Sequence, residues 1–119
     1  MPSIRPDLPS DPALDSRLTE LRSRFRAALP ERVSIVHQRL AALRPGEWPK
    51  PAAEALRGEI HSLAGSSGLF GFDGIGAAAQ DFEKLLIGIA KQSAASHADM
   101  EELLDAMARL DQAAALAIH

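Results

Sequence analysis

Hydrophobic residues recur three or four positions apart along most of the chain, which is the period of an amphipathic helix. The first stretch of this kind opens with Asp11 and Pro12, an N-cap residue followed by proline at the first helical position. Proline inside a helix removes a backbone hydrogen bond and clashes with the preceding turn, so Pro30 is expected to interrupt this helix or restart it. The apolar positions before that proline are Leu14, Leu18, Leu21, Phe25 and Leu29.

Four more helices are predicted after this proline. The first of them ends before a loop at residues 44–51 that contains three prolines. The next starts near Pro51, and the one after it starts at Asp73, a suitable N-cap. Ser96 and Asp99 resemble a capping box and open the last helix. The predicted apolar faces consist of Val33, Val36, Leu40 and Leu43, of Leu56, Ile60, Leu63, Ser67 and Phe70, of Ile75, Ala78, Ala79, Phe82, Leu86 and Ile89, and of Met100, Leu103, Leu104, Met107 and Leu110.

Five helices joined by short loops predict an all-α fold, namely an antiparallel four-helix bundle with an additional N-terminal helix. The chain has 119 residues, of which 46% are hydrophobic, and this is enough for one domain with a single core. Three prolines among residues 1–11 deny backbone donors, so this segment is expected to be a flexible arm. Residues 12–119 then form the helical bundle domain.

Composition narrows the range of partners. The formal net charge is −3, and the segment near the N-terminus that contains several arginines also carries acidic residues, so we do not expect nucleic acid as a partner. The chain has no cysteine, which excludes disulfides and thiolate chemistry and agrees with a reducing compartment. The expected location is therefore the cytoplasm. No apolar run reaches the roughly 18 residues of a membrane span, and the N-terminus lacks the apolar stretch of a signal peptide, so we expect no membrane contact.

Two kinds of binding site can be tested directly on the sequence. The four histidines are His37, His61, His97 and His119, and no two of them have the three- or four-residue spacing of metal ligands on one helix face. A glycine-rich run at residues 65–76 lacks the Lys-Ser/Thr pair of a nucleotide-binding P-loop, and it follows no strand. We therefore expect neither a metal nor another cofactor in this chain.

His61 is the best candidate for a reactive group. At 100° per residue it lies about 130° from the apolar face that contains Leu56 and Ile60, so its imidazole is expected to face solvent. An interior helical glycine costs about 0.5 to 1 kcal/mol relative to alanine, yet several glycines lie within two turns of His61. A bare surface of this kind suits the close approach of a partner. The residues expected on this side of the helix are Arg57, Gly58, Ala64, Gly65 and Gly68.

The chemistry of an exposed imidazole fits phosphoryl transfer. In water an imidazole side chain has a pKa of about 6.5, so near pH 7 it is largely neutral, nucleophilic and able to form a reactive phosphoramidate. Without a surrounding pocket, a partner would have to supply any metal and the remaining electrostatic stabilisation. The alternative is an ordinary exposed histidine beside glycines that only weaken a helix end. The residue pattern alone leaves both interpretations open.

One stretch of the sequence combines His61-Ser62-Leu63-Ala64-Gly65-Ser66 with Gly71 and, one helix later, with Phe82 and Glu83. In kind and spacing these residues resemble the signature of the histidine-containing phosphotransfer (HPt) family, over about residues 54–86. The resemblance implies an antiparallel four-helix bundle in which His61 is phosphorylated on Nε2. The phosphoryl group would be exchanged with an aspartate of a response-regulator receiver domain. Magnesium in that exchange belongs to the receiver.

The resemblance also implies partners and residue roles. It implies response-regulator receivers and a histidine kinase or hybrid kinase as partners, and a monomeric chain. It assigns Gly65 and Gly68 to close approach beside the histidine, and Gly71 to the turn of the helical hairpin. The family commonly has lysine three residues after the histidine, where this chain has Ala64. Arg57 is either a substitute for that cation or a solvated surface residue.

Three functions remain open at this point. The first is a phosphocarrier without kinase activity of its own. The second is a noncatalytic HPt-like interaction module that binds a receiver or histidine kinase without passing phosphate, an alternative that the alanine at the lysine position supports. The third is an enzyme such as a kinase fragment or a phosphatase, although no ATP-binding motif is visible. The initiating Met1 and the compact helical body favour a free-standing protein.

Overall fold

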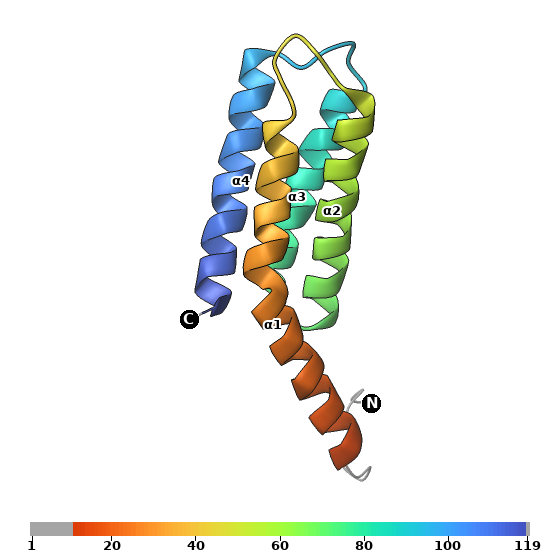
Figure 1. The fold of residues 1–119 in the computed structure, drawn as a ribbon, viewed down its shortest axis with the longest axis vertical. Coiled ribbons are helices and arrows are strands. Elements are labelled where there is room, and N and C mark those ends of the chain that lie inside the picture. Colours follow the sequence, from red (N-terminus) through yellow and green to blue (C-terminus); the bar gives the residue numbers. More distant parts are fainter. Residues whose placement is uncertain (1–10, 119) are drawn as a thin grey trace, which may run out of the picture.

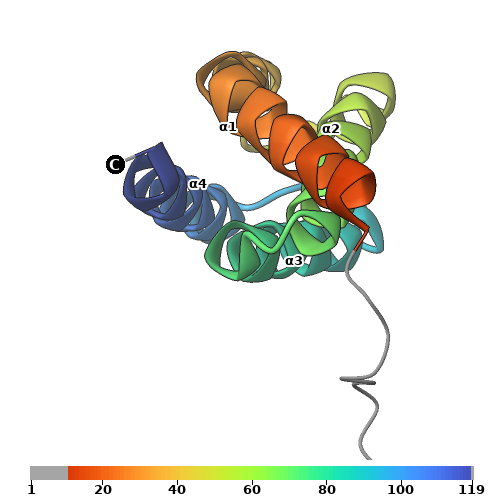
Figure 2. The same cartoon turned by 90° about the horizontal axis from the view of Figure 1, so that it is seen from below.

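The computed structural model describes residues 11–118, and in that range it contains four helices (Figure 1). These are α1 (Pro12–Ala41), α2 (Lys50–Leu69), α3 (Asp73–Ala90) and α4 (His97–Ile118). Successive helices run in opposite directions, and the end-on view shows them arranged around one core (Figure 2). The described chain is therefore all-helical, as the hydrophobic pattern predicts. None of these helices is both long and apolar enough to cross a membrane.

The helix at the N-terminus is continuous where the sequence predicts two. The prediction of an additional N-terminal helix that is interrupted at Pro30 is wrong, because α1 runs through this proline for 30 residues. Pro30 is exposed, so water can bind the Arg26 carbonyl that loses its backbone donor. Leu29 and Val33, on either side, are buried and hold both halves in place. The proline accounts for the change of direction along α1 in Figure 1.

The N-terminal half of α1 projects from the bundle. It extends beyond the other three helices and leans beneath the α2–α3 turn (Figures 1 and 2). The predicted apolar face of this helix is buried only from Phe25 onwards, whereas Leu14 and Leu18 are 55% and 43% exposed. The predicted flexible arm, residues 1–11, lies outside the described residues except for Asp11.

The other predicted apolar faces meet in one core. Each fully buried aliphatic or aromatic side chain contributes on the order of 1.5–3 kcal/mol relative to an exposed one. Leu104 departs from the pattern, since it is 57% exposed although it belongs to the predicted face of the last helix. Fully buried side chains from all four helices include Leu29, Val36, Leu56, Ile60, Leu63, Ile75, Phe82, Leu86, Leu103 and Leu110.

Two of the three predicted helix caps are confirmed. The carboxylate of Asp11 accepts hydrogen bonds from the first backbone N–H groups of α1 at 3.0 and 3.3 Å. Ser96 and Asp99 form a reciprocal capping box, with hydrogen bonds of 2.8 and 3.0 Å. The prediction of Asp73 as an N-cap is wrong, because Phe72 occupies the cap position and buries its ring there. Asp73 is instead the first residue of α3, where a negative charge favours the helix dipole.

The α2–α3 turn depends on Gly71. Its φ of +79° lies in the left-handed region, which glycine adopts without steric cost. The N–H of Phe72 donates to the carbonyl of Ser67 at 2.8 Å, the closing bond of a Schellman motif. The predicted role of Gly71 in this turn is confirmed. The tight turn sets α2 and α3 side by side, which brings together residues far apart in sequence.

Candidate functional site

His61 on α2 and Glu83 on α3 meet across the seam between the two helices. Nδ1 of His61 lies 2.9 Å from Oε2 and 3.2 Å from Oε1 of Glu83. The imidazole is 72% exposed, which confirms its predicted position, whereas the carboxylate beneath it is only 15% exposed. The signature includes Glu83, but the sequence assigns it no role because its partner is 22 residues away.

This pair determines which ring nitrogen is available for reaction. A carboxylate has only acceptor atoms, so Nδ1 of His61 carries the hydrogen and donates it to Glu83. In the neutral ring the lone pair then lies on Nε2, the nitrogen that is not bonded to Glu83. The arrangement can therefore present Nε2 as a nucleophile while Glu83 holds the ring in place.

Arg57 shares the same carboxylate. Its Nη1 lies 3.5 Å from Oε2 of Glu83, and its Nη2 lies 3.2 Å from Oε2 of Glu54. Helical side chains tilt toward the helix N-terminus, so the ring of His61 leans over the turn that holds Arg57 and Gly58. A phosphoryl group on Nε2 would therefore lie over a turn that carries a guanidinium group.

Three exposed glycines of α2 lie around His61: Gly58, Gly65 and Gly68. A Cβ atom added at any of them would meet nothing within 4 Å, and none has a positive φ. The helix also runs unbroken through Gly58 and Gly65. Nothing in the described fold therefore requires glycine at these positions. This finding favours a bare surface for a partner over the interpretation of these glycines as helix breakers.

Ala64 lies elsewhere than predicted. The prediction that it shares the exposed side of α2 with His61 is wrong, because Ala64 is only 9% exposed and belongs to the core. Helix α3 comes close at this point. A Cβ atom added at Gly76 would lie 3.9 Å from the carbonyl oxygen of Ala64 and 3.7 Å from Cβ of Ser67. These are ordinary van der Waals distances, so α3 packs directly over Ala64 at this point.

A second guanidinium group reaches this region from α1. Nη2 of Arg32 donates to Oγ of Ser62 at 3.0 Å, next to His61 in the sequence. The same guanidinium lies 5.6 Å from the centre of the Phe25 ring, within the range of a cation–π contact. These two contacts place a cation on the α1 side of His61. The sequence does not predict this neighbour, because it depends on how α1 packs against α2.

The other histidines are arranged differently. His37 on α1 binds Asp111 on α4 through Nε2, at 2.8 and 3.0 Å. In His37 the carboxylate therefore binds Nε2, the nitrogen that has no carboxylate partner in His61. The pair links α1 to α4. His97 is the exposed first residue of α4, and His119 lies outside the described residues.

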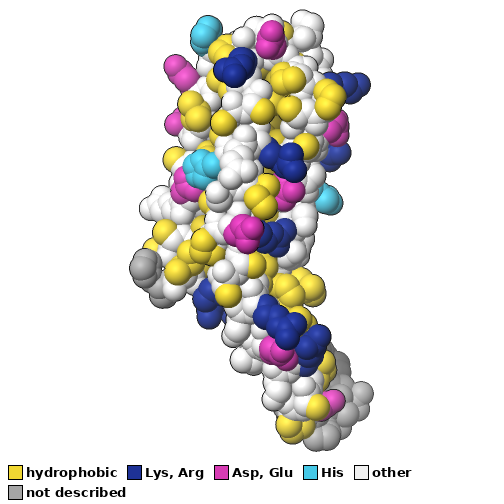
Figure 3. Space-filling view, in the orientation of Figure 1, with side chains coloured by type: hydrophobic (Ala, Val, Ile, Leu, Met, Phe, Trp, Pro, Cys, Tyr) yellow, Lys and Arg dark blue, Asp and Glu magenta, His cyan; other side chains and the backbone are white. Residues whose placement is uncertain are grey.

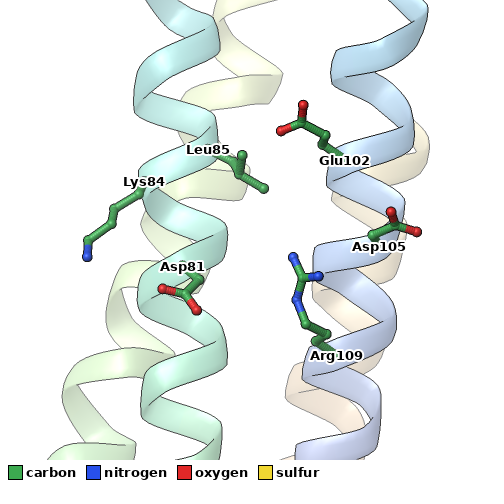
Figure 4. Close-up of a pocket in the computed structure, with 6 residues that line it drawn as sticks. All are labelled: Asp81, Lys84, Leu85, Glu102, Asp105 and Arg109. Carbon is green, nitrogen blue, oxygen red and sulfur yellow. The ribbon is translucent and has the colours of Figure 1, made fainter.

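A groove of about 500 Å³ lies between α3 and α4 (Figure 4). It carries charges of both signs, and Lys84 points away from α4. Among residues 11–118, no group of three His, Asp or Glu side chains is placed to hold a metal ion. Nothing in the groove indicates a particular ligand. The lining residues are Asp81, Lys84, Leu85, Glu102, Asp105 and Arg109.

Comparison with known families identifies the family of this chain. The family model of the Hpt domain matches residues 20–113, which is most of the chain. No curated protein and no solved structure matches the chain. The matched range includes His61, Glu83 and Arg57. The chain therefore belongs to the Hpt domain family, whose general role is histidine phosphotransfer in two-component phosphorelays.

Proposed function

We propose that this chain relays phosphoryl groups between His61 and the aspartates of response-regulator receiver domains, without kinase activity of its own. A histidine kinase or hybrid kinase would supply the phosphoryl group to the pathway, in the cytoplasm. The observation that most supports this function is the contact between His61 and Glu83. This contact holds the hydrogen on Nδ1, so the lone pair of the neutral ring lies on Nε2. The imidazole itself is 72% exposed, so a partner can reach that nitrogen.

The proposed step is a direct displacement at phosphorus. The Nε2 lone pair attacks the phosphorus of a receiver aspartyl phosphate, and the N–P bond forms as the bond to the aspartate oxygen breaks. The aspartate leaves as a carboxylate. The phosphorylated ring then carries positive charge, which the Glu83 carboxylate offsets through the hydrogen bond to Nδ1. We propose that the receiver holds the magnesium ion and that this chain contributes no cofactor.

The proposed docking surface surrounds His61 on α2. Gly58, Gly65 and Gly68 leave room for the receiver, and Arg57 contributes positive charge. Ala64 lies beneath this surface and contributes little to it, because α3 covers Ala64. A receiver must bring its aspartate within bonding distance of Nε2, and small residues around the histidine permit that approach.

Incubation with a panel of phosphorylated receiver domains tests this function. Label should move from at least one receiver to the chain, and it should be labile in acid and stable in base, as expected of a phosphoramidate. ATP alone should not label the chain. Receivers that bind but never transfer would instead support the noncatalytic interaction module, an alternative favoured by Ala64 at the usual lysine position.

Loss of the Glu83 carboxylate should slow transfer without abolishing it. In Glu83→Leu the His61 ring can rotate and exchange its hydrogen between nitrogens. Because a hydrogen bond to a charged group contributes about 1.5 kcal/mol, we expect transfer to be about tenfold slower. Glu83→Gln can still accept from Nδ1 through its amide oxygen, so its loss should be smaller. Asp111→Leu is the matched control, because it removes the carboxylate that is bonded to His37. This variant should transfer normally. A wild-type rate in Glu83→Leu would contradict the role of Glu83.

Substitutions at Arg57 and Ala64 test whether a positive charge near the phosphoryl group promotes transfer. A cation a few Å from a phosphoryl group gains about 1 kcal/mol in water-like surroundings, and salt reduces the gain. Arg57→Ala should therefore slow transfer several-fold. Ala64→Lys should restore it, since a lysine stem can extend past α3 and bring its ammonium group to the surface. The measurements are transfer rates and phosphohistidine lifetimes of both single variants and the double variant at two ionic strengths. Identical behaviour of all variants would show that neither position acts electrostatically.

A further inference from the structure

The contact between His61 and Glu83 also limits the side from which a partner can reach the ring. The two nitrogens of an imidazole point in nearly opposite directions. Because Nδ1 is directed at Glu83 on α3, Nε2 points away from α3 and over the exposed face of α2. A partner that brings a reacting group to Nε2 must therefore approach over this face of α2 and not over the α2–α3 seam.

The exposed face of α2 has His61 along one edge and Ser62 along the other. At 100° per residue the two side chains are about 100° apart around the helix, and Gly58 and Gly65 lie between them. Ser62 is the residue that accepts a hydrogen bond from Arg32 of α1. The face that the partner crosses is thus a strip of glycines between the reactive histidine and an arginine of another helix.

Arg32 differs from several other arginines of α1 and α2 in its neighbours. Basic and acidic side chains are interspersed over these two helices (Figure 3). Arginines that form salt bridges with glutamates are Arg17, Arg24, Arg39 and Arg57. Arg32 instead contacts Oγ of Ser62 and the ring of Phe25, and both of these groups are uncharged. Within residues 11–118, its positive charge is therefore held in place but not neutralised by a carboxylate.

The contacts of Arg32 leave its guanidinium group able to bind a partner. A guanidinium group has five N–H donors, and the hydrogen bond to Ser62 uses one nitrogen, Nη2. The side chain as a whole is half-buried, so its stem is packed against the protein. A side chain that is ordered before binding loses less conformational entropy when a partner arrives.

The chemistry of a receiver domain matches this cation. In the proposed exchange the receiver holds the magnesium ion beside its phosphorylated aspartate, and carboxylates are the side chains that bind magnesium in proteins. The face that the receiver turns toward His61 therefore carries acidic groups. A fixed positive charge at the edge of the glycine strip complements such a face and can select the orientation in which it docks.

We propose that receiver domains approach His61 from the α1 side, across Gly58 and Gly65, and that an acidic side chain of the receiver pairs with Arg32. The docking surface then extends from α2 onto α1, and Arg32 sets the orientation of the receiver without touching the phosphoryl group. This inference rests on the proposed function, because it concerns the partner of the same site.

Binding and transfer measurements with the receivers of the panel test the role of Arg32. Arg32→Glu should raise both the Kd of the unphosphorylated receiver and the KM of transfer about tenfold, and Arg32→Ala about threefold. The kcat at saturating receiver should stay within about twofold of the wild-type value, because a docking residue acts before the chemical step. The difference between wild type and Arg32→Ala should shrink with salt. Thermal melts control for the lost contacts with Ser62 and Phe25.

Lys84→Glu is the matched control for the direction of approach. It makes the same change of charge on the α3 side, at the residue after Glu83, and should leave Kd and KM within about twofold of wild type. Equal effects of Arg32→Glu and Lys84→Glu would overturn the approach from the α1 side. A fall in kcat with unchanged KM would show that Arg32 acts on the chemical step, which would overturn its docking role.

Charge reversal on the receiver identifies the partner of Arg32. Each exposed Asp or Glu around the phosphorylated aspartate is replaced by Arg in turn, and at least one replacement should weaken binding to wild type and restore binding to Arg32→Glu. Failure of every replacement to restore binding would overturn the proposed pair. The proposed function is tested separately: receivers that bind through Arg32 but never transfer contradict the relay only, whereas transfer that is indifferent to Arg32 contradicts only this inference. If no receiver binds, both are wrong.

Discussion

A His61→Gln variant is expected to fold like the wild type and to accept no phosphoryl group from any receiver. The side chain is 72% exposed, and its hydrogen bond to Glu83 lies at the surface, so the substitution should change the free energy of unfolding by less than about 1 kcal/mol. The amide of glutamine has no nucleophilic lone pair comparable to that of Nε2. Loss of transfer should therefore be complete. The measurements are label transfer from phosphorylated receivers and thermal melts.

His37→Gln is the matched control for this prediction. His37 also pairs with a carboxylate, but through Nε2, and the contact with Asp111 joins α1 to α4. Its replacement should leave transfer unchanged and slightly lower the melting temperature. Transfer that survives in His61→Gln, or a label that appears on His37 or His97, would show that His61 is not the acceptor.

A side chain in place of Gly65 or Gly68 should block transfer sterically. Because the receiver must place its aspartate against Nε2, Gly65→Arg or Gly68→Leu should lower the transfer kcat/KM at least about tenfold. Stability should not fall. A Cβ atom at either position meets nothing within 4 Å, and replacing a helical glycine favours the helix by about 0.5 to 1 kcal/mol. Stopped transfer with an unchanged or higher melting temperature would separate a docking defect from a folding defect.

Gly88→Arg provides the control for these two variants. Gly88 is also an exposed, unstrained helical glycine with open space around it. It lies on α3 about 140° around the helix from Glu83, so a side chain there points away from His61. This variant should gain the same helix propensity and transfer normally. If Gly65→Arg and Gly68→Leu also transfer at the wild-type rate, the glycines are not part of the docking surface.

The contacts of Glu83 suggest how the site changes on phosphorylation. In the described state the carboxylate is shared by His61 and Arg57. Phosphorylation of Nε2 would add negative charge over the turn that holds Arg57 and positive charge on the ring. Glu83 would then interact more strongly with the ring, and Arg57 with the phosphoryl group. The comparison of Glu83→Leu with Arg57→Ala separates these two contributions.

The sequence by itself determines the local features of this protein. Apolar spacing identifies three of the four helices closely, and the capping box of Ser96 and Asp99 marks the start of α4, because both depend on neighbours within one turn. The same periodicity places His61 on the solvent side of α2. Gly71 is required by the backbone of a single turn, and the family resemblance assigns it to that turn. The family signature depends on these local features.

Only the tertiary structure decides the contacts between helices. Helix α1 continues through Pro30 because buried residues on both sides hold it, which proline's local preference does not reveal. Ala64 is covered because α3, another helix, packs directly over it. Leu14 and Leu18 are exposed because the other helices end above them. Glu83 reaches His61 for the same general reason: helical periodicity indicates which way a side chain points, whereas the length, crossing and close approach of neighbouring helices determine what it meets.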